Sequence, residues 1–270
     1  CILILSFWGS DLMTTPGGVK EYKIQYEALR RADVITTQTL DLRTILLSKY
    51  GQELLPKIQC QTFDPLSSKA GLIKTLATED SRKKLKEKYG IEEDKICLQV
   101  GYSSAKGQNH LKILQQINKL SKEQKEKLAV FVPLSYNAKG DYIQNLLEEF
   151  QKMDVQIIPI LSYLTDGEML AIVSGCEIFI SIRENDALNA AMVESLYAGN
   201  QVITGAWLPY GIYKRNGIEF LEIDSISELH SILLNALNSE TELRSTQNKD
   251  RLYQLYNPDI ISKSWSKVYS

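Results

Sequence analysis

The sequence predicts an α/β protein built on parallel, doubly wound sheets. From Lys95 onward, apolar runs of strand length alternate with segments of helical periodicity, which is the pattern of a buried parallel sheet covered by helices. The same alternation occupies residues 1–63 in a shorter form. Because 270 residues are enough for two domains, we expect two such sheets, joined by a linker at residues 65–78 that is rich in turn residues.

The amino-terminal unit, residues 1–72, is expected to be incomplete. The chain opens on an apolar strand without an initiator methionine, so we interpret this unit as the remnant of a longer domain. Asp11 follows the first strand in the loop Trp8-Gly9-Ser10-Asp11, where it is either a helix cap or a base facing the cleft between the domains. Helices are predicted at residues 19–31 and 40–49, and strands at residues 1–7, 33–37 and 57–63.

The second unit, residues 79–255, is expected to hold a complete sheet. A last helix at residues 256–270, which begins near Pro258, is expected to pack back toward the first domain. The helix at residues 79–89 is basic and amphipathic, and is either a solvated face or a surface for an anionic membrane. Strands are predicted at residues 96–102, 128–134, 155–161, 176–183, 202–204 and 218–223, and further helices at 108–120, 141–153, 165–173, 187–198, 227–237 and 242–255.

Composition and charge exclude several classes of function. A net charge of −2 without a basic block makes nucleic acid an unfavourable partner. Neither G-x-x-x-x-G-K-[ST] nor G-x-G-x-x-G occurs, which argues against a P-loop ATPase and a nicotinamide dehydrogenase. The two histidines are isolated, so we expect no histidine-rich metal site, and no apolar run approaches the ~20 residues of a membrane span. The four cysteines lack a C-x-x-C spacing, which predicts free thiols in a reducing cytoplasm.

Residues 176–205 form the unit on which the functional interpretation depends. An apolar strand is followed by a polar turn, a helix and a second strand, so the turn lies where open α/β sheets bind their ligands. Asp186 is predicted to cap a helix over residues 187–198, which Gly199 ends. The free N–H groups at the start of that helix suit a phosphate. These groups belong to Ala187, Leu188 and Asn189.

Glu194 lies two turns into the predicted helix, on the same face as Ala187, Ala190 and Ala191. A carboxylate roughly 10–12 Å behind a phosphate site suits the hydroxyl groups of a ribose. The alternative interpretation is a solvated helix residue beside alanines that only pack.

A second candidate site is the turn from Gly101 to Gly107, which leaves a strand and opens a helix. Its N–H groups, the hydroxyls of Ser103 and Ser104 and the ammonium group of Lys106 could hold a diphosphate. The alternative is an exposed lysine in an ordinary turn between a strand and a helix.

Both candidate sites resemble those of GT-B glycosyltransferases. Asp186-x7-Glu194, followed by Ser-Leu-Tyr-Ala-Gly-Asn-Gln-Val-Ile, is similar to the Glu-x7-Glu block of the large retaining family, with the first Glu replaced by Asp186. Lys106 and the glycine after it are similar to the turn that binds the donor diphosphate, although the arginine of that turn falls on Tyr102. The string from Gly101 to Leu111 also resembles lipid-linked aminofucosyl transferases, an inverting GT-B family.

The resemblance extends to the amino-terminal unit, where Gly9-Ser10-Asp11 and Ala32-Asp33-Val34-Ile35 fall at matching points. It implies a GT-B fold, in which two Rossmann-like doubly wound domains face a cleft, here with the first domain incomplete. It further implies that Glu194 holds the nucleotide ribose and that groups at Tyr163 and Leu164 hold the base.

The implied function is transfer of a sugar from a nucleotide-diphosphate donor to a lipid-linked or polysaccharide acceptor, in polysaccharide biosynthesis. Asp186 and Asp11 are the candidate catalytic carboxylates, while Lys106 and the helix start stabilise the leaving diphosphate without a metal or a cofactor. We expect a cytoplasmic enzyme that contacts the membrane surface. Two alternatives stay open: a catalytically silent GT-B module that acts as an assembly partner, and a non-hydrolysing nucleotide-sugar epimerase, which needs a histidine in the cleft.

Overall fold

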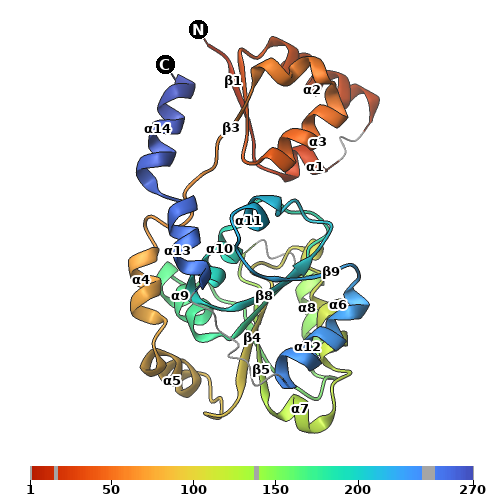
Figure 1. Cartoon of the computed structure of the whole chain (residues 1–270). Coiled ribbons are helices and arrows are strands. Elements are labelled where there is room, and N and C mark those ends of the chain that lie inside the picture. The colour runs from red at the N-terminus through yellow and green to blue at the C-terminus, as the bar shows by residue number, and fades with distance from the viewer. Residues whose placement is uncertain (1, 15–17, 137–139, 239–246, 270) are drawn as a thin grey trace.

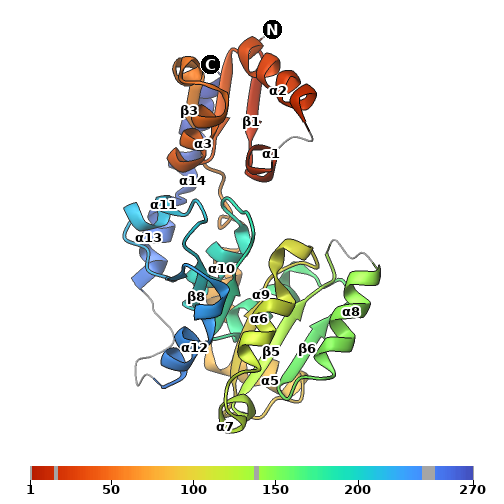
Figure 2. The same ribbon diagram turned by 90° about the vertical axis from the view of Figure 1, so that its right-hand side faces the viewer.

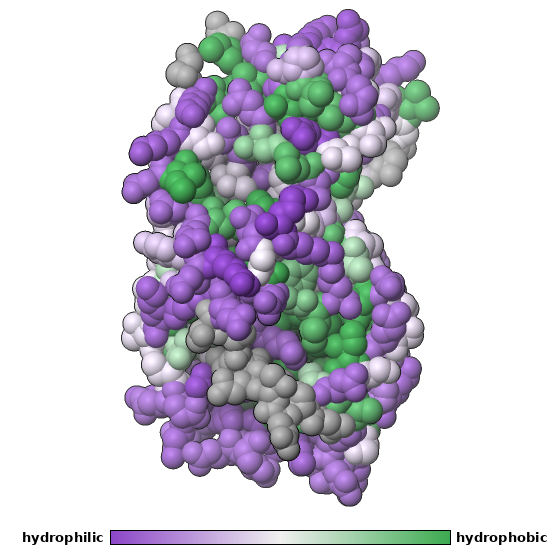
Figure 3. All heavy atoms as spheres, viewed as in Figure 1, coloured by the Kyte–Doolittle hydropathy of each residue, from purple (hydrophilic) through white to green (hydrophobic). Residues whose placement is uncertain are grey.

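The computed structural model describes residues 2–14, 18–136, 140–238 and 247–269. Within these residues the chain forms two parallel sheets, one of three strands and one of six, each in its own lobe (Figure 1). Helices connect the parallel strands, which is the α/β architecture that the sequence predicts. The outline of the molecule narrows on one side between the two lobes (Figure 3).

The amino-terminal sheet has the strand order β1-β2-β3. Thr39 caps the helix after β2, because its hydroxyl accepts a hydrogen bond from the N–H of Leu42 at 3.1 Å. The predicted strand at residues 57–63 is shorter in the structure, where β3 is an edge strand that pairs only with β2. The elements are β1 (Ile4–Phe7), α1 (Ser10–Met13), α2 (Val19–Arg31), β2 (Val34–Thr37), α3 (Leu40–Tyr50), a 3₁₀ helix (Gln52–Lys57) and β3 (Ile58–Cys60).

The core of this lobe lies between the sheet and its helices. Leu29, Ile35, Leu42 and Leu46 are fully buried there. Each such side chain stabilises the fold by roughly 1.5–3 kcal/mol relative to an exposed one. Ala187 of the other lobe packs against the same cluster, so the two lobes are in direct contact.

The carboxyl-terminal sheet has the strand order β6-β5-β4-β7-β8-β9. The chain adds strands on one side of β4 and then, from β7, on the other side, so the order reverses between β4 and β7. Ligands of doubly wound sheets bind at such a switch point, outside the carboxyl ends of the strands. The strands are β4 (Ile96–Val100), β5 (Leu128–Pro133), β6 (Gln156–Ile160), β7 (Ile178–Ser181), β8 (Gln201–Gly205) and β9 (Leu221–Ile223).

Helices cover both faces of this sheet (Figure 2). One core cluster packs α6, α8 and α12 against the strands, and two others pack α5, α9 and α10 against the opposite face. The central strands are continuous apolar runs because both of their faces are buried. The helices are α5 (Glu79–Lys88), α6 (His110–Ile117), α7 (Lys122–Glu126), α8 (Gly140–Phe150), α9 (Asp166–Gly175), α10 (Ala190–Ala198), α11 (Gly211–Arg215) and α12 (Leu229–Asn238).

The segment between the lobes differs from the predicted linker, because it contains a helix, α4 (Ala70–Leu76). This helix forms because Leu66 and Ile73 are buried with side chains of α9 and α10, and such long-range packing leaves no local signature in the sequence.

The last two helices, α13 (Gln247–Leu255) and α14 (Pro258–Tyr269), return the chain to the amino-terminal lobe (Figure 1). The indole N–H of Trp265 donates to the carbonyl of Thr62 at 2.9 Å, and its ring lies 4.9 Å from that of Phe63. The predicted helix at residues 242–255 begins outside the described residues and is seen from Gln247. In the described part of the chain, no helix is long and apolar enough to cross a membrane.

Candidate functional site

The two turns singled out in the sequence lie side by side at the switch point, after β4 and β7. The N–H of Glu184 donates to the carbonyl of Gly107 at 3.1 Å, and the side-chain amide of Asn109 donates to the carbonyl of Ile182 at 3.0 Å. These bonds hold the turn at residues 101–107 against the turn at residues 182–189. The structure therefore brings together the two candidate phosphate sites.

Asp186 is buried at the centre of a hydrogen-bond network. Its Oδ1 accepts from the N–H of Ala187 at 2.8 Å and from Nη1 of Arg183 at 3.1 Å. Its Oδ2 accepts from the hydroxyl of Tyr210 at 2.8 Å and from the side-chain amide of Asn189. Both carboxylate oxygens are therefore engaged in positioning their neighbours, and the catalytic role of Asp186 stays a prediction.

The helix of this site begins later than predicted. Asn189, not Asp186, is the N-cap, since its side-chain oxygen accepts from the N–H of Met192 at 2.6 Å and the helix runs from Ala190. Asp186 does not cap the helix because both oxygens of its carboxylate are engaged by the four donors named above. Ala187 lies before the helix and faces the other lobe: a Cβ placed on Gly9 would lie 2.5 Å from the Cβ of Ala187. This contact places the loop after β1 against the switch point.

Arg183 is a site residue that the sequence analysis missed. Its Nη1 donates to the hydroxyl of Tyr102, and its guanidinium lies 5.3 Å from the centre of that ring. The guanidinium of Arg183 thus reaches Tyr102, on which the arginine of the similar turn falls, from the neighbouring strand. The signal for it was an arginine directly after a buried strand, at the edge where ligands bind.

The hydroxyl of Tyr102 is the acceptor in this contact. Burial, together with the charge of Asp186, raises the pKa of the Tyr102 hydroxyl, so the phenol keeps its proton at neutral pH. Because its oxygen accepts from Arg183, its O–H is left to donate to another acceptor.

Glu194 is buried and paired, not solvated. It is 5% exposed, and its Oε1 lies 2.6 Å from Nζ of Lys69, in the segment that leads into α4. The sequence analysis did not foresee Lys69, which comes from a segment taken for a linker. The role of Glu194 toward a ribose stays a prediction, and Lys69 is the group with which ribose hydroxyls would share that carboxylate.

Lys106 and the two serines of the turn differ in their surroundings. Ser103 and Ser104 are buried: the first accepts from the amide of Gln108 at 3.1 Å, and the second donates to the carbonyl of Tyr136 at 2.7 Å. Their hydroxyls therefore shape the turn. Lys106 is exposed, and none of the ion pairs in the described part of the chain includes it. Its Nζ lies 5.8 Å from the ring centre of Tyr142.

The remaining predicted residues lie farther from this centre. Tyr163 is 82% exposed and follows the edge strand β6, two strands or roughly 10 Å from β4. Leu164 packs onto the core cluster beneath α9. Asp11 accepts from the N–H of Trp8 at 3.0 Å and that of Gly9 at 2.8 Å, so it shapes the loop that meets Ala187. Among the described residues, no group of three or more His, Cys, Asp or Glu side chains could hold a metal ion.

His110 makes stability depend on pH. It opens α6, is fully buried and lies 3.2 Å from the hydroxyl of Tyr142. Burial lowers the pKa of His110 to about 4, and a smaller contact with the Ser103 backbone acts in the opposite sense. The unfolded chain, with a histidine pKa of about 6.5, therefore binds this proton between pH 6.5 and pH 4 while the folded chain does not.

We expect the contribution of His110 to stability to fall by about 2 kcal/mol between pH 7 and pH 5. Urea unfolding at the two pH values measures the change in the free energy of unfolding. In His110→Gln, this change should be smaller by the contribution of His110. An equal pH dependence in the wild type and the variant would contradict the assignment to His110.

The fold of this protein is similar to that of several solved structures. No known family model and no curated protein matches the sequence. The structure is similar to HepE from Anabaena, solved with UDP and glucose, with a TM-score of 0.78 and 10% identity over 99% of this chain and 71% of HepE. A glycosyltransferase from Rickettsia africae gives a TM-score of 0.74 and 12% identity, over 98% of this chain and 69% of that protein. Sucrose-phosphate synthase from Thermosynechococcus elongatus gives 0.73 and 12%, over 98% and 66%.

At 10–12% identity the likeness to these proteins concerns the fold, and this chain spans 66–71% of their length. Together with the strand order and the contact between Gly9 and Ala187, it shows that the chain has the GT-B fold, with two Rossmann-like lobes.

Proposed function

We propose that this protein is a glycosyltransferase whose donor is a nucleotide-diphosphate sugar. One observation supports it above others: the switch point between β4 and β7 gathers cationic groups, the amino end of α10 and, behind them, the buried carboxylate of Glu194. The loop at Gly9 approaches this edge from the other lobe. HepE, which has the same fold, is known in complex with UDP-glucose.

In the proposed reaction, the bond between the anomeric carbon and the diphosphate oxygen breaks, a bond to an acceptor hydroxyl forms, and a base takes the proton of that hydroxyl. Lys106, Arg183 and the N–H groups of Leu188 and Asn189 before α10 stabilise the charge that develops on the diphosphate, while the N–H of Ala187 is already bonded to Asp186. Tyr102 donates to the same group. The chemistry needs no metal, because these groups supply the positive charge.

The remaining residues hold the parts of the donor that do not react. Glu194 accepts from the ribose hydroxyls, and the backbone at Tyr163 and Leu164 lies toward the base. Asp186 positions Arg183. Asp186 and Asp11 are the two candidate carboxylates for the catalytic base.

The acceptor is, in our proposal, a lipid-linked or growing polysaccharide, and the enzyme works at the cytoplasmic face of a membrane. The support is α5, which presents Lys83, Lys84 and Lys88 with more than half of each side chain exposed, each in a surface ion pair with Glu93, Asp80 or Glu168. Surface ion pairs are weak, so these lysines can exchange their partners for anionic lipids, which attract a lysine by about 1 kcal/mol near the membrane.

A thermal-shift experiment on the whole chain tests donor binding. We expect UDP, GDP or dTDP to raise the melting temperature more than the matching nucleoside does, because the diphosphate contacts are the charged ones. A chromatographic assay with the corresponding nucleotide sugars then reports release of the nucleoside diphosphate. If no nucleoside diphosphate shifts the melting temperature of the folded protein, the proposal is wrong.

Lys106→Ala is expected to weaken the binding of UDP by roughly ten- to hundredfold and to leave the binding of uridine unchanged. A charge-assisted contact contributes about 1.5–3 kcal/mol and acts on phosphate, not on ribose. Calorimetric titration with both ligands measures the difference, and Lys112→Ala, an exposed lysine on α6, is the matched control. If the affinities for UDP and uridine fall equally, Lys106 does not contact the diphosphate.

One observation favours a second candidate, a catalytically silent GT-B module. Asp186 and Glu194 already have protein partners, so neither carboxylate stands free. A silent module would bind nucleotides without turning them over, so the same two assays separate the candidates. The epimerase alternative has less support, because His110 is fully buried and His230 lies on α12, which packs against α6.

A further inference from the structure

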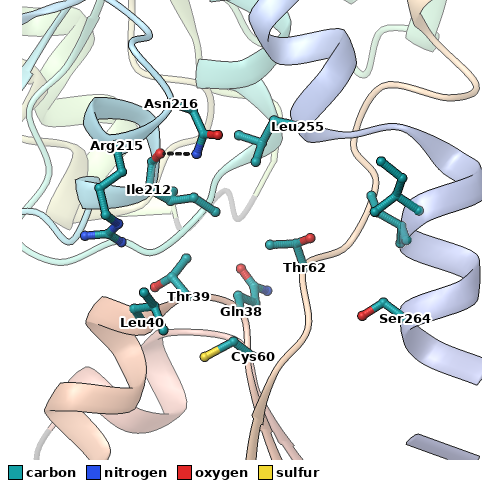
Figure 4. Close-up of a pocket in the computed structure, with 12 residues that line it drawn as sticks. Gln38, Thr39, Leu40, Cys60, Thr62, Ile212, Arg215, Asn216, Leu255 and Ser264 are labelled. Carbon is teal, nitrogen blue, oxygen red and sulfur yellow. Dashed lines mark hydrogen bonds between the residues drawn. The ribbon is translucent and has the colours of Figure 1, made fainter. Parts of the chain in front are cut away.

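A cavity of about 450 Å³ lies where the two lobes meet the last two helices, apart from the switch point (Figure 4). Its walls come from the carboxyl ends of β2 and β3, from α11 and from α13 and α14. Lys106, Arg183 and Glu194 do not line it. The cavity is therefore a separate site, and both lobes contribute to it.

Gln38 marks the floor of this cavity. The residue is 5% exposed, and its Oε1 is buried without a hydrogen-bond partner among the described residues. Figure 4 shows the side chain of Gln38 at the wall of the space between the lobes. An unpaired buried carbonyl oxygen is unfavourable, so a rotation of the amide that brings this oxygen to the cavity wall, where a ligand O–H or N–H can donate to it, would regain that loss.

The rest of the lining is free of unpaired charge. Arg215 is its charged side chain, and its two terminal nitrogens lie 3.3 and 2.6 Å from the carboxylate oxygens of Asp41, which neutralises it. The other polar groups are hydroxyls and an amide, and the apolar ones are aliphatic. They include Thr62, Asn216, Ser264, Ile212 and Leu255.

We propose that this cavity binds a neutral saccharide of one or two rings. Ring hydroxyls donate to Gln38 and exchange hydrogen bonds with Thr62 and Asn216, while the C–H face of the ring packs on Ile212 and Leu255. Among the described residues that line the cavity, a charged ligand would find no free counter-charge. The proposal goes beyond the donor site, because it uses none of the groups that hold the nucleotide.

Cys60 is a reporter for occupancy of the cavity. It lines the cavity, carries a free thiol and is half-buried, whereas Cys97 and Cys176 are fully buried. In a Cys1→Ser background, the rate of modification by a maleimide therefore follows access to Cys60. Cys60→Ser confirms which thiol reacts.

The experiment compares this rate with and without glucose, galactose and maltose, in the absence of nucleotide. We expect at least one of these sugars to slow the modification several-fold, in a saturable manner. Gln38→Leu should abolish the protection and leave the melting temperature unchanged or higher, because it removes an unpaired polar atom. Thr62→Val is a second variant, and Gln151→Leu, at an exposed position after α8, is the matched control.

Protection by no sugar, or equal protection in wild type and Gln38→Leu, would overturn the proposal. UDP binding, measured on the same samples, separates this result from the proposed function. If UDP binds but no sugar protects Cys60, only the cavity proposal fails; if a sugar protects Cys60 but UDP does not bind, only the proposed function fails.

Discussion

Asp186→Ala is expected to lower the free energy of unfolding by about 3–5 kcal/mol, the range for removing one partner of a buried ion pair. The substitution leaves Arg183 without its carboxylate and leaves the hydroxyl of Tyr210 without an acceptor, while the amide of Asn189 keeps only its bond to the Tyr210 oxygen. Tyr210 is fully buried and cannot turn to water. Urea unfolding at neutral pH measures the loss.

Two variants serve as controls for Asp186→Ala. Asp186→Asn keeps the size and one acceptor oxygen, so a smaller loss is expected. Glu184→Ala removes an exposed carboxylate two residues earlier and should change stability by less than about 0.5 kcal/mol. If Asp186→Ala unfolds like Glu184→Ala, the network around Asp186 does not stabilise the fold.

Glu194→Gln is expected to weaken the binding of UDP by roughly ten- to hundredfold. Gln keeps the length of the side chain, but it replaces two charged acceptor oxygens by one neutral acceptor and a donor, a loss of about 1.5–3 kcal/mol toward ribose hydroxyls. The loss should shrink for 2′,3′-dideoxy-UDP, which lacks those hydroxyls. Calorimetric titration of both ligands measures the two affinities.

Glu194→Gln also removes the charged partner of Lys69, so the substitution affects stability as well as binding. The side chain of Lys69 is 29% exposed and can turn to water, so we expect a modest change in stability. Glu148→Gln, at an exposed position on α8, is the matched control. If Glu194→Gln leaves the affinity for UDP unchanged in a folded protein, the partner of Glu194 is Lys69 alone and the ribose role is lost.

The central part of the fold could be predicted from local pattern. The strands at Ile96–Val100, Leu128–Pro133 and Ile178–Ser181 are apolar runs because a parallel sheet is buried on both faces. The capping box of Thr165 and Glu168 marks the start of α9, since it satisfies the free N–H groups of the helix end. The position of both candidate turns follows, because a turn after a parallel strand can only lie at the carboxyl edge.

Boundaries and partners depended on the tertiary structure. Asn189 caps α10 because Asp186 is held by Tyr210, which lies 24 residues farther along the chain. A helix replaced the expected linker because its apolar side chains find a surface on α9 and α10. Local propensity could not reveal either result, since packing outweighs differences of a few tenths of a kcal/mol per residue.

The sequence by itself determined the α/β class, the alternation of elements and the edge of the sheet at which the charged groups gather. Only the tertiary structure decided which charges those are. Lys69 reaches Glu194 across 125 residues of sequence, and Arg183 reaches Tyr102 across 81. Such pairs have no periodicity or spacing to detect, because each energy depends on the distance and burial that the folded chain creates.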